Sequence, residues 1–252
     1  MFASRQLATV ILAAGKGTRM KNPNKSKVMF ELDGKPMIQY VIELALEINS
    51  DLVIAVVGYN KQSVIDFIEE EFPDSMGKIT FAHQDEQLGT GHAVMQARDI
   101  LKDFKGDVLI LSGDVPLLKP ETISEFLEFH YENSNKASMI SAYFDDPHGY
   151  GRVVRDINMD VTGVVEEKDA SEIQKQIKEI NSGIYLIDSS ELLNALDSLS
   201  TDNAQGEYYL TDIFKYLNEK SKKVGAYPVE NNIEITGINT FEQLKELEKH
   251  LN

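Results

Sequence analysis

The chain has 252 residues, of which 42% are hydrophobic and 26% charged, so it carries enough apolar sequence for one large core. Its 25 lysines and arginines against 41 aspartates and glutamates give a net charge of −16, and we therefore expect neither nucleic acid nor a membrane surface as a partner. The absence of cysteine excludes disulfides, thiolate metal sites and cysteine nucleophiles.

The first half of the chain alternates strand-like and helix-like segments. Short runs of apolar and β-branched residues predict strands, and apolar residues at every third or fourth position predict helices. Such alternation is typical of an α/β fold, Rossmann-like, with a mainly parallel mixed sheet and helices on both faces. In chain order we expect strands at 7–13, 52–57, 79–82 and 108–111, and helices at 37–48, 61–72, 90–101 and 120–131.

The second half is less regular, and it predicts a small antiparallel subregion that forms a lid. No linker rich in Pro, Gly or Ser and no internal repeat interrupts the chain, so we expect residues 1–252 to form one domain. The expected strands are at 137–144, 152–155, 163–167, 180–187 and 224–229, and the expected helices at 170–178, 190–199, 210–220 and 240–250.

The first predicted strand runs into a glycine-rich string, LAAGKGTRM, at residues 12–20. Glycines let the backbone approach phosphate oxygens, and the side chains of Lys16 and Arg19 add positive charge. A dinucleotide fingerprint would need glycine in place of Met20, and the Gly-Lys-Ser/Thr of a P-loop is absent. We interpret the string as a different kind of loop for a nucleoside triphosphate, although a turn between a strand and a helix can also need glycine.

Cations gather around this loop although the chain as a whole is acidic. A solvated surface loop is the usual explanation for such a charge run. The preceding glycine-rich turn favours an anion site instead, because a phosphate ligand of an acidic protein needs its cations concentrated locally. The cluster consists of Lys16, Arg19, Lys21, Lys25 and Lys27.

Two further polar residues are candidates for a metal site. Asp114 follows a buried strand, and ligands of parallel sheets bind beyond the carboxyl ends of the strands, where Gly15 should also lie. Mg²⁺ takes one or two protein oxygens together with phosphates and waters. The alternative for Asp114 is a turn in which it bonds its own backbone. Asn239 could serve as a neutral ligand or could lead into the cap of the last helix.

A second unusual string, QDEQLGTGHA, occupies residues 84–93. Glutamine both donates and accepts hydrogen bonds, which suits the edge of a pyrimidine base. Gly89 and Gly91 permit close approach, and Thr90 can cap the following helix. The alternative is a polar loop with an N-cap. At the start of an apolar helix, His92 is expected to be a packed structural histidine and not a catalytic base.

Polar residues recur along the second half. Gly151 would let a sugar lie against the backbone, and Asn181 needs a reason to stand in a strand. Glu166 and Glu167 are neighbours on a predicted strand and should point to opposite faces. The string at 203–212 is rich in polar and aromatic residues, which suits a carbohydrate contact or a loop with a helix cap.

Taken in order, these strings resemble the sugar-1-phosphate nucleotidylyltransferases. The resemblance is to the uridylyltransferase half of the bacterial enzymes that join N-acetylglucosamine-1-phosphate uridylyltransferase to glucosamine-1-phosphate acetyltransferase. It implies that UTP and N-acetylglucosamine 1-phosphate give UDP-N-acetylglucosamine and pyrophosphate with Mg²⁺ as cofactor. The strings that carry it are 12–20, Lys27, 84–93, 113–118, 150–152, 166–170, 179–183, 203–212 and 237–239.

The resemblance also implies roles for individual residues. It implies catalysis by Arg19 and Lys27, with Lys25 as the alternative to Lys27, and Mg²⁺ binding by Asp114 and Asn239. The implied nucleotide-binding residues are Leu12, Ala13, Ala14, Gly15, Lys16, Gly17, Gln84, Gln87, Gly89 and Thr90. The implied sugar-binding residues are Gly113, Gly151, Glu166, Asn181, Tyr209 and Thr211.

Two alternatives remain open at this point: transfer to another sugar 1-phosphate, such as glucose 1-phosphate, and a non-catalytic module that binds nucleotide sugars. Ser182 stands where the family commonly has threonine, and no hexapeptide repeat of an acetyltransferase β-helix occurs in the 252 residues. We therefore expect the uridylyl-transferring half alone, with a monomer favoured. Because residues 1–6 carry no signal-peptide core and no apolar run could span a bilayer, we expect a cytoplasmic location.

Overall fold

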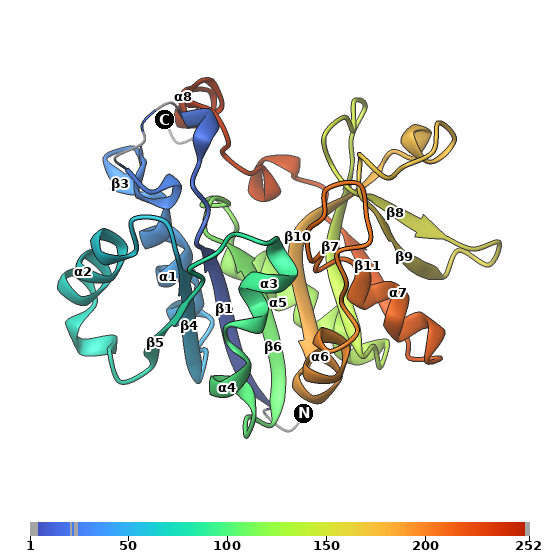
Figure 1. Ribbon diagram of the computed structural model, residues 1–252, viewed down its shortest axis with the longest axis horizontal. Helices are drawn as coiled ribbons and strands as arrows, with labels where there is room; N and C mark the ends of the chain where they lie inside the picture. Colours follow the sequence, from blue (N-terminus) through green and yellow to red (C-terminus); the bar gives the residue numbers. More distant parts are fainter. Residues whose placement is uncertain (1–4, 21, 23–24, 250–252) are drawn as a thin grey trace.

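One nine-stranded sheet organises the part of the chain that the computed structural model describes, residues 5–20, 22 and 25–249 (Figure 1). Neighbouring strands on its main path are parallel, except that β10 is antiparallel to both β6 and β7. The predicted α/β architecture with a mainly parallel sheet is confirmed. The path runs β11 (Val224–Pro228), β7 (Ala137–Tyr143), β10 (Glu179–Asp188), β6 (Gly106–Ser112), β1 (Gln6–Ala13), β4 (Leu52–Val57) and β5 (Ile79–His83).

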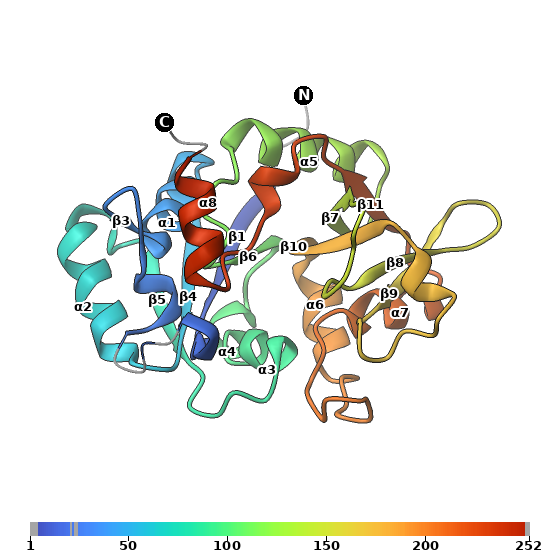
Figure 2. The same cartoon turned by 90° about the horizontal axis from the view of Figure 1, so that it is seen from above.

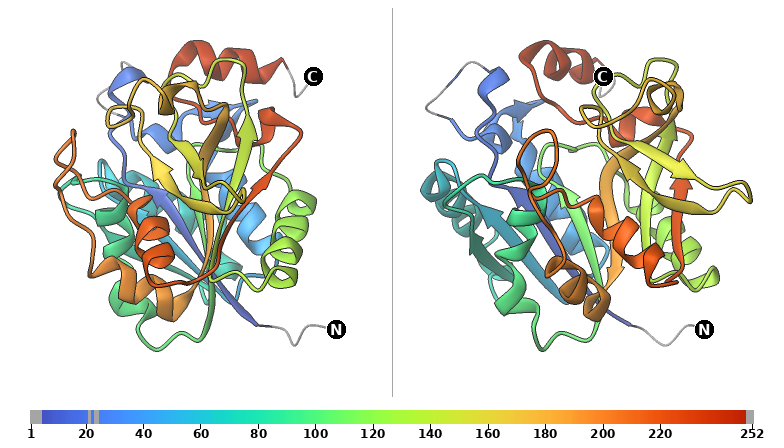
Figure 3. Two further views of the ribbon diagram at one scale, coloured as in Figure 1. Left: turned by 90° about the vertical axis from the view of Figure 1, so that its right-hand side faces the viewer. Right: turned by 45° about the vertical axis from the view of Figure 1, so that its right-hand side comes forward.

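Helices cover both faces of this sheet because alternate strand residues point to opposite sides. In β1, Ala8 and Val10 belong to one buried cluster, whereas Ile11 and Ala13 belong to the other. Figure 3 shows α5 on one side of the sheet, with α6 and α7 on the other. The first cluster packs against α3 (Thr90–Met95), α4 (Arg98–Leu101), α6 (Ser189–Leu196) and α7 (Asp212–Glu219), and the second against α1 (Met37–Glu47), α2 (Lys61–Glu71) and α5 (Pro120–Glu132).

The predicted antiparallel subregion is a hairpin of β8 (Arg152–Arg155) and β9 (Val161–Val165), attached to β10 at Ile180. Figure 2 shows it standing beside α7 at the end of the molecule away from α2. The strand expected at 163–167 begins and ends two residues earlier. Both Glu166 and Glu167 therefore lie in the turn after β9, and not on the strand itself.

A third, smaller apolar cluster joins residues 20–37 to residues 238–247. It packs α8 (Phe241–Glu248) against β2 (Glu31–Leu32), one of two short paired strands with β3 (Lys35–Pro36). Thr240 begins α8 with a reciprocal capping box to Gln243. His250, the predicted end of this helix, lies outside the described residues. The cluster consists of Met20, Leu32, Met37, Ile238, Leu244 and Leu247, so it holds the glycine-rich string next to residues 237–240.

Two helix predictions need correction. The helix expected at 170–178 is wrong: only one 3₁₀ turn, η4 (Gln174–Gln176), forms there. Ile173 is 81% exposed, so this short segment lacks the buried apolar face that would stabilise a helix. The helix expected at 90–101 is divided into α3 and α4, because Gln96 and Ala97 bond three residues back. None of the helices in the described ranges has the length and apolar character needed to cross a membrane.

Candidate active site

The glycine-rich loop lies at the carboxyl edge of the sheet, directly after β1. A Cβ added at Gly15 would meet no atom within 4 Å, so the backbone there is open to a ligand. Gly17 has a φ of +60°, and a Cβ on it would lie 2.6 Å from Cβ of Lys27. The two glycines of this loop therefore serve different purposes: Gly15 leaves the backbone accessible, and Gly17 lets the chain pack against Lys27. Lys16 is exposed on the same loop.

Lys27 stands at the centre of the charged part of the site. Its ammonium donates to Asp114 Oδ2 and, at 2.8 Å, to Asn239 Oδ1, which also accepts from the Arg19 guanidinium at 2.6 Å. Asp114 stands 87 residues after Lys27 in the chain, and Asn239 stands 212 residues after it. We call these four residues, Arg19, Lys27, Asp114 and Asn239, the charged centre.

Lys25, the alternative to Lys27, takes part in other contacts. Lys25 pairs with Glu31 at 3.1 Å and lies over the ring of Phe30, so it is Lys27 and not Lys25 that reaches Asp114. Lys21 lies outside the described residues. The contact with Asp114 favours Lys27 over Lys25, and the catalytic role of Lys27 stays a prediction.

Backbone contacts fix the two metal-ligand candidates against each other. Ile238 N donates to the carbonyl of Asp114 at 2.9 Å, and Ile238 itself is buried in the third apolar cluster. A Cβ on Gly237 would lie within 3.6–3.9 Å of the side chains of both Asp114 and Asn239. The side chains of Asp114 and Asn239 therefore converge from two segments on one small volume, which the third cluster stabilises.

The donor set of the charged centre fits a hard divalent cation. One carboxylate oxygen and one amide oxygen already converge on a single positive group, the Lys27 ammonium. Mg²⁺ accepts such a pair of protein oxygens and completes its shell with phosphate and water oxygens. A site of this type needs no third protein ligand, and indeed no group of three or more His, Cys, Asp or Glu residues suited to a metal occurs in the described residues.

The second string forms a loop that is tied to the segment 207–210. Gly91 N donates to the Tyr208 carbonyl, Tyr208 N donates to the Leu88 carbonyl, and a Cβ on Gly89 would lie 2.6 Å from Tyr208 O. The glycines of this string thus admit a protein segment. The expectation that Thr90 caps α3 is wrong: Gly89 is the capping residue, and Thr90 Oγ1 instead accepts from Leu210 N at 3.3 Å.

Within that loop, the two glutamines are held differently. Gln84 is only 3% exposed, and its amide nitrogen donates to the Gly89 carbonyl at 3.1 Å. Gln87 is half-buried and donates to the Gln84 carbonyl at 3.2 Å. His92 is flanked by Gln84 and by Gln96, each within 3.2 Å of a ring nitrogen, as expected for a packed histidine.

A cavity of about 190 Å³ brings together most of the predicted sugar residues. Glu166 accepts from the Thr211 hydroxyl at 2.8 Å, and Asn181 donates to the Tyr185 hydroxyl at 2.8 Å. Asn181 stands at a bulge of β10, beside Gly183 with a φ of +82°, which explains an asparagine in a strand. The cavity is lined by Leu12, Thr90, Ser112, Gly149, Tyr150, Gly151, Glu166, Asn181, Ser182, Gly183, Tyr185, Leu210 and Thr211.

Burial makes this cavity favour uncharged groups. It raises the pKa of the Glu166 carboxyl, and although the Thr211 hydroxyl opposes this, the charges of Asp212 and Asp169 add to it. Burial likewise raises the pKa of Tyr150, and the negative charge of Asp114 adds to that effect. Tyr150 therefore lies within electrostatic reach of the charged centre, and it connects the two parts of the site.

Two predicted sugar residues do not line this cavity. Tyr209 donates to Asp169 at 3.0 Å and lines a neighbouring cavity, and Gly113 packs beneath Leu12 and Val28. Sequence reasoning missed Ser112 and Tyr185 as lining residues. Ser112 directly precedes the string 113–118. Tyr185 lies in β10 like Asn181, and the bulge between the two residues brings them within hydrogen-bond distance.

Comparison with known proteins shows the family of this chain. The model of the nucleotidyl transferase family matches residues 8–233. The chain belongs to the nucleotidyl transferase family. The bifunctional protein GlmU of Geotalea daltonii is 45% identical over 241 residues, 96% of this chain and 51% of that protein. That of Caldanaerobacter subterraneus is 45% identical over 244 residues, again 51% of its length.

The chain therefore spans about half the length of the curated relatives it matches. Among solved structures, a UDP-glucose pyrophosphorylase complexed with UDP-glucose covers 98% of both chains with a TM-score of 0.79 and 17% identity. At this sequence identity the likeness shows that the two proteins share a fold.

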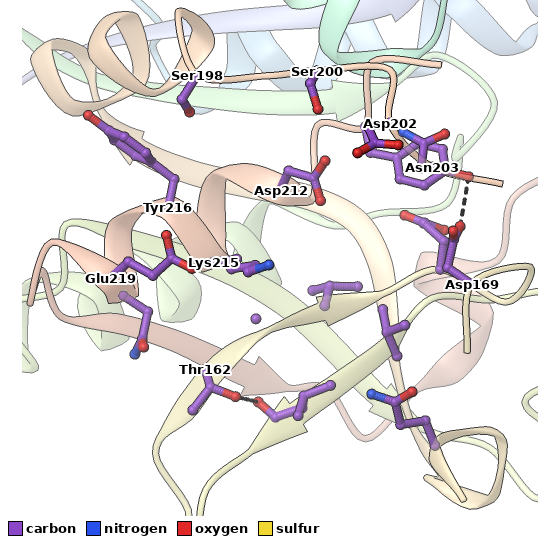
Figure 4. A pocket seen from close by; sticks show the side chains of 18 residues that line it. Thr162, Asp169, Ser198, Ser200, Asp202, Asn203, Asp212, Lys215, Tyr216 and Glu219 are labelled. Carbon is purple, nitrogen blue, oxygen red and sulfur yellow. Dashed lines mark hydrogen bonds between the residues drawn. The ribbon is translucent and has the colours of Figure 1, made fainter. Parts of the chain in front are cut away.

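Beside the cavity of about 190 Å³, which we call the sugar cavity after the residues predicted to bind sugar, lies a larger one of about 830 Å³ that is lined by β9 and α7. Figure 4 shows Asp169, Asp202, Asp212 and Glu219 around it, with Lys215 as the cation among the labelled side chains. Burial raises the pKa of Asp212, and the charge of Asp169 adds to the rise. A nucleotidyl transferase binds phosphorylated substrates, which such an acidic cavity repels, so the smaller cavity beside the charged centre is the better candidate.

Proposed function

We propose that this chain transfers the uridylyl group of UTP to N-acetylglucosamine 1-phosphate, releasing pyrophosphate and using Mg²⁺. The observation that carries the proposal is the charged centre, in which Lys27 joins Asp114 and Asn239 beside the open loop at Gly15. A module that only binds nucleotide sugars would need neither these converging oxygens nor two cations around them. The identity to bifunctional GlmU proteins supports the choice of nucleotide and sugar.

The reaction needs charge compensation more than proton transfer. An oxygen of the sugar phosphate, already ionised at pH 7, attacks the α-phosphorus of UTP, and the bond from that phosphorus to the bridging oxygen of pyrophosphate breaks. Arg19 and Lys27 offset the charge of the two polyanions and orient them in line. Bound Mg²⁺, held by Asp114 and Asn239, would supply further charge neutralisation.

In the proposed binding mode, the backbone of the loop around Gly15 donates to the triphosphate, while Gln84 and Gln87 face the base. The amino sugar occupies the cavity between Gly151, Asn181 and Glu166. Neutral polar groups suit an N-acetyl group, because its amide offers one donor and one acceptor. We infer a monomer for this chain.

The decisive assay measures pyrophosphate release from UTP with a panel of sugar 1-phosphates. We expect N-acetylglucosamine 1-phosphate to be used best and glucose 1-phosphate poorly, because buried polar groups left unpaired discriminate strongly. With ATP or GTP in place of UTP, the rate should fall at least about tenfold, as expected from a lost buried hydrogen-bond pair of about 1–3 kcal/mol. Faster turnover with glucose 1-phosphate would favour the alternative sugar, and binding of UDP-sugars without any turnover would favour the non-catalytic module.

A further inference from the structure

His92 lies in the second string and has no role in the proposed reaction. It lies in the first turn of α3, and its ring stands between two side-chain amides and over Tyr208, with ring centroids 6.1 Å apart. Nδ1 lies 3.1 Å from the amide nitrogen of Gln84, and Nε2 lies 3.2 Å from that of Gln96. Such a contact with Gln84 matters because Gln84 is one of the two glutamines proposed to face the base.

Each amide is anchored by a second hydrogen bond to a backbone carbonyl. The nitrogen of Gln84 also donates to Gly89 O at 3.1 Å, and that of Gln96 donates to His92 O at 2.9 Å. Turning the Gln84 amide over would bring its oxygen against the Gly89 carbonyl and lose that bond. The nitrogen of Gln84 therefore stays a donor, and Nδ1 of His92 accepts from it.

This arrangement assigns the imidazole one tautomer. In a neutral imidazole one ring nitrogen accepts a hydrogen bond and the other carries the proton. Because Nδ1 accepts from Gln84, the ring proton is on Nε2. Gln96 is then held by the backbone carbonyl of His92 and not by the ring. Both hydrogens of the Gln84 amide nitrogen are occupied, and Oε1 has no hydrogen bond to any described residue and is not enclosed.

We propose that His92 is a positioning residue that holds Gln84 with its carbonyl oxygen toward the nucleobase and so sets the choice of uracil over cytosine. The inference rests on the proposed function. Uracil presents an N–H donor at N3, whereas cytosine presents a lone pair there, which an acceptor repels. An amide locked by Gly89 and His92 cannot turn to offer cytosine its nitrogen.

The experiment compares kcat/KM for UTP and CTP, each with N-acetylglucosamine 1-phosphate, in wild type and His92→Phe. Phenylalanine keeps a ring over Tyr208 but offers no acceptor. We expect the UTP/CTP ratio to fall about 3- to 10-fold, as for one lost hydrogen bond. A ratio of two constants measured on one preparation does not depend on its active fraction, so a general loss of folded enzyme cannot produce this change.

Two further variants test the mechanism. In His92→Asn, the side-chain oxygen can accept from Gln84 in place of Nδ1, and the ratio should recover toward the wild-type value. Gln96→Met removes the contact on the other side of the ring and should leave the ratio unchanged. If His92→Phe does not fold, His92→Leu carries the same comparison.

An unchanged ratio in His92→Phe or His92→Leu would overturn the positioning role, and so would an equal fall in Gln96→Met. These outcomes leave the proposed function intact as long as wild type turns over UTP. A wild-type enzyme that prefers CTP, or uses no nucleoside triphosphate, would instead contradict the uridylyl transfer on which the inference rests.

Discussion

The charged centre and the sugar cavity adjoin at one edge of the sheet but are built on different principles. In the charged centre, cations meet oxygen atoms of distant segments: Lys27 pairs with the Asp114 carboxylate, and Arg19 donates to the Asn239 amide oxygen. In the sugar cavity, hydrogen bonds link mostly uncharged groups, such as Thr211 with Glu166 and Asn181 with Tyr185. Burial there raises the pKa of the carboxyl that the cavity does contain.

The difference indicates a division of labour. Charge that develops between two polyanions is offset where cations and a metal can act, so changes in the charged centre should reduce kcat. Recognition of a neutral sugar depends on oriented donors and acceptors, so changes in the cavity should raise KM for the sugar phosphate. If variants of the charged centre raised KM for the sugar phosphate and variants of the cavity lowered kcat, the two regions would be one functional unit.

The largest effect is expected for Asp114→Ala. Loss of the carboxylate removes one of two oxygens proposed to hold Mg²⁺, and turnover should fall at least about 100-fold, as for other groups that stabilise transition-state charge. Pyrophosphate release at saturating substrates measures it, with thermal unfolding as a check on the fold. Asp197→Ala, which removes a surface partner of Arg98, is the matched control. Turnover within a few-fold of wild type would remove Asp114 from the metal site.

Lys27→Ala and Lys25→Ala form a second pair, separated by two positions in the chain. Lys27→Ala should lower kcat about 100-fold, because the variant loses a cation at the reacting phosphates. Lys25→Ala removes the exposed pair with Glu31 and the contact with the Phe30 ring, and turnover should stay within about twofold of wild type. Equal losses in both variants would mean that the whole lysine cluster attracts the substrate and that Lys27 has no special position.

Asn181→Ala tests the cavity. We expect KM for N-acetylglucosamine 1-phosphate to rise about fivefold or more, as for one buried hydrogen bond, with KM for UTP nearly unchanged. Steady-state kinetics with each substrate varied in turn measures both constants. Asn158→Ala, in the exposed turn of the β8–β9 hairpin, is the control. A rise in KM for UTP alone would assign Asn181 to the nucleotide and contradict the division proposed above.

The parallel half of the fold was predictable from sequence, and so was the edge at which the site lies. Regular alternation of apolar strands and amphipathic helices defines β1, β4 and β6, and parallel strands place Gly15 and Asp114 together by topology alone. Asn239 was different, because its proximity to Lys27 depends on the third apolar cluster, whose members lie far apart in the chain. The residues alone left Asn239 open between a neutral metal ligand and the lead into a helix cap, and the family resemblance favoured the metal ligand.

Errors arose where tertiary contacts replaced local rules. The string 84–93 predicted that Thr90 caps a helix, yet Gly89 takes that place and Thr90 Oγ1 accepts from Leu210 N. The segment 170–178 has helical composition but no core to pack against. Neither outcome can be read from a local pattern, because each depends on what a distant segment supplies.

The smallest expected effect concerns stability, and it compares Glu166 with its neighbour Glu167. Burial raises the pKa of Glu166 from its ordinary 4.5, so its contribution to stability is present at low pH and is lost as pH rises above that value. At Glu167 burial acts in the same direction, but the pair with Arg152 at 2.7 Å outweighs it and lowers the pKa. The contribution of Glu167 is therefore present above pH 4.5 and is lost as pH falls.

The variants Glu166→Gln and Glu167→Gln should accordingly respond to pH with opposite signs. Relative to wild type, the Tm of Glu166→Gln should be higher at pH 7 than at pH 4, because glutamine never ionises in the cavity. The Tm of Glu167→Gln should be lower than wild type at pH 7, with the gap closing toward pH 4. In a chain of this size 1 kcal/mol corresponds to about 2–4 °C, which calorimetry resolves. Parallel behaviour of the two variants would mean that both carboxyl groups share one environment, which would contradict the distinction between Glu167, paired with Arg152, and Glu166, buried in the cavity.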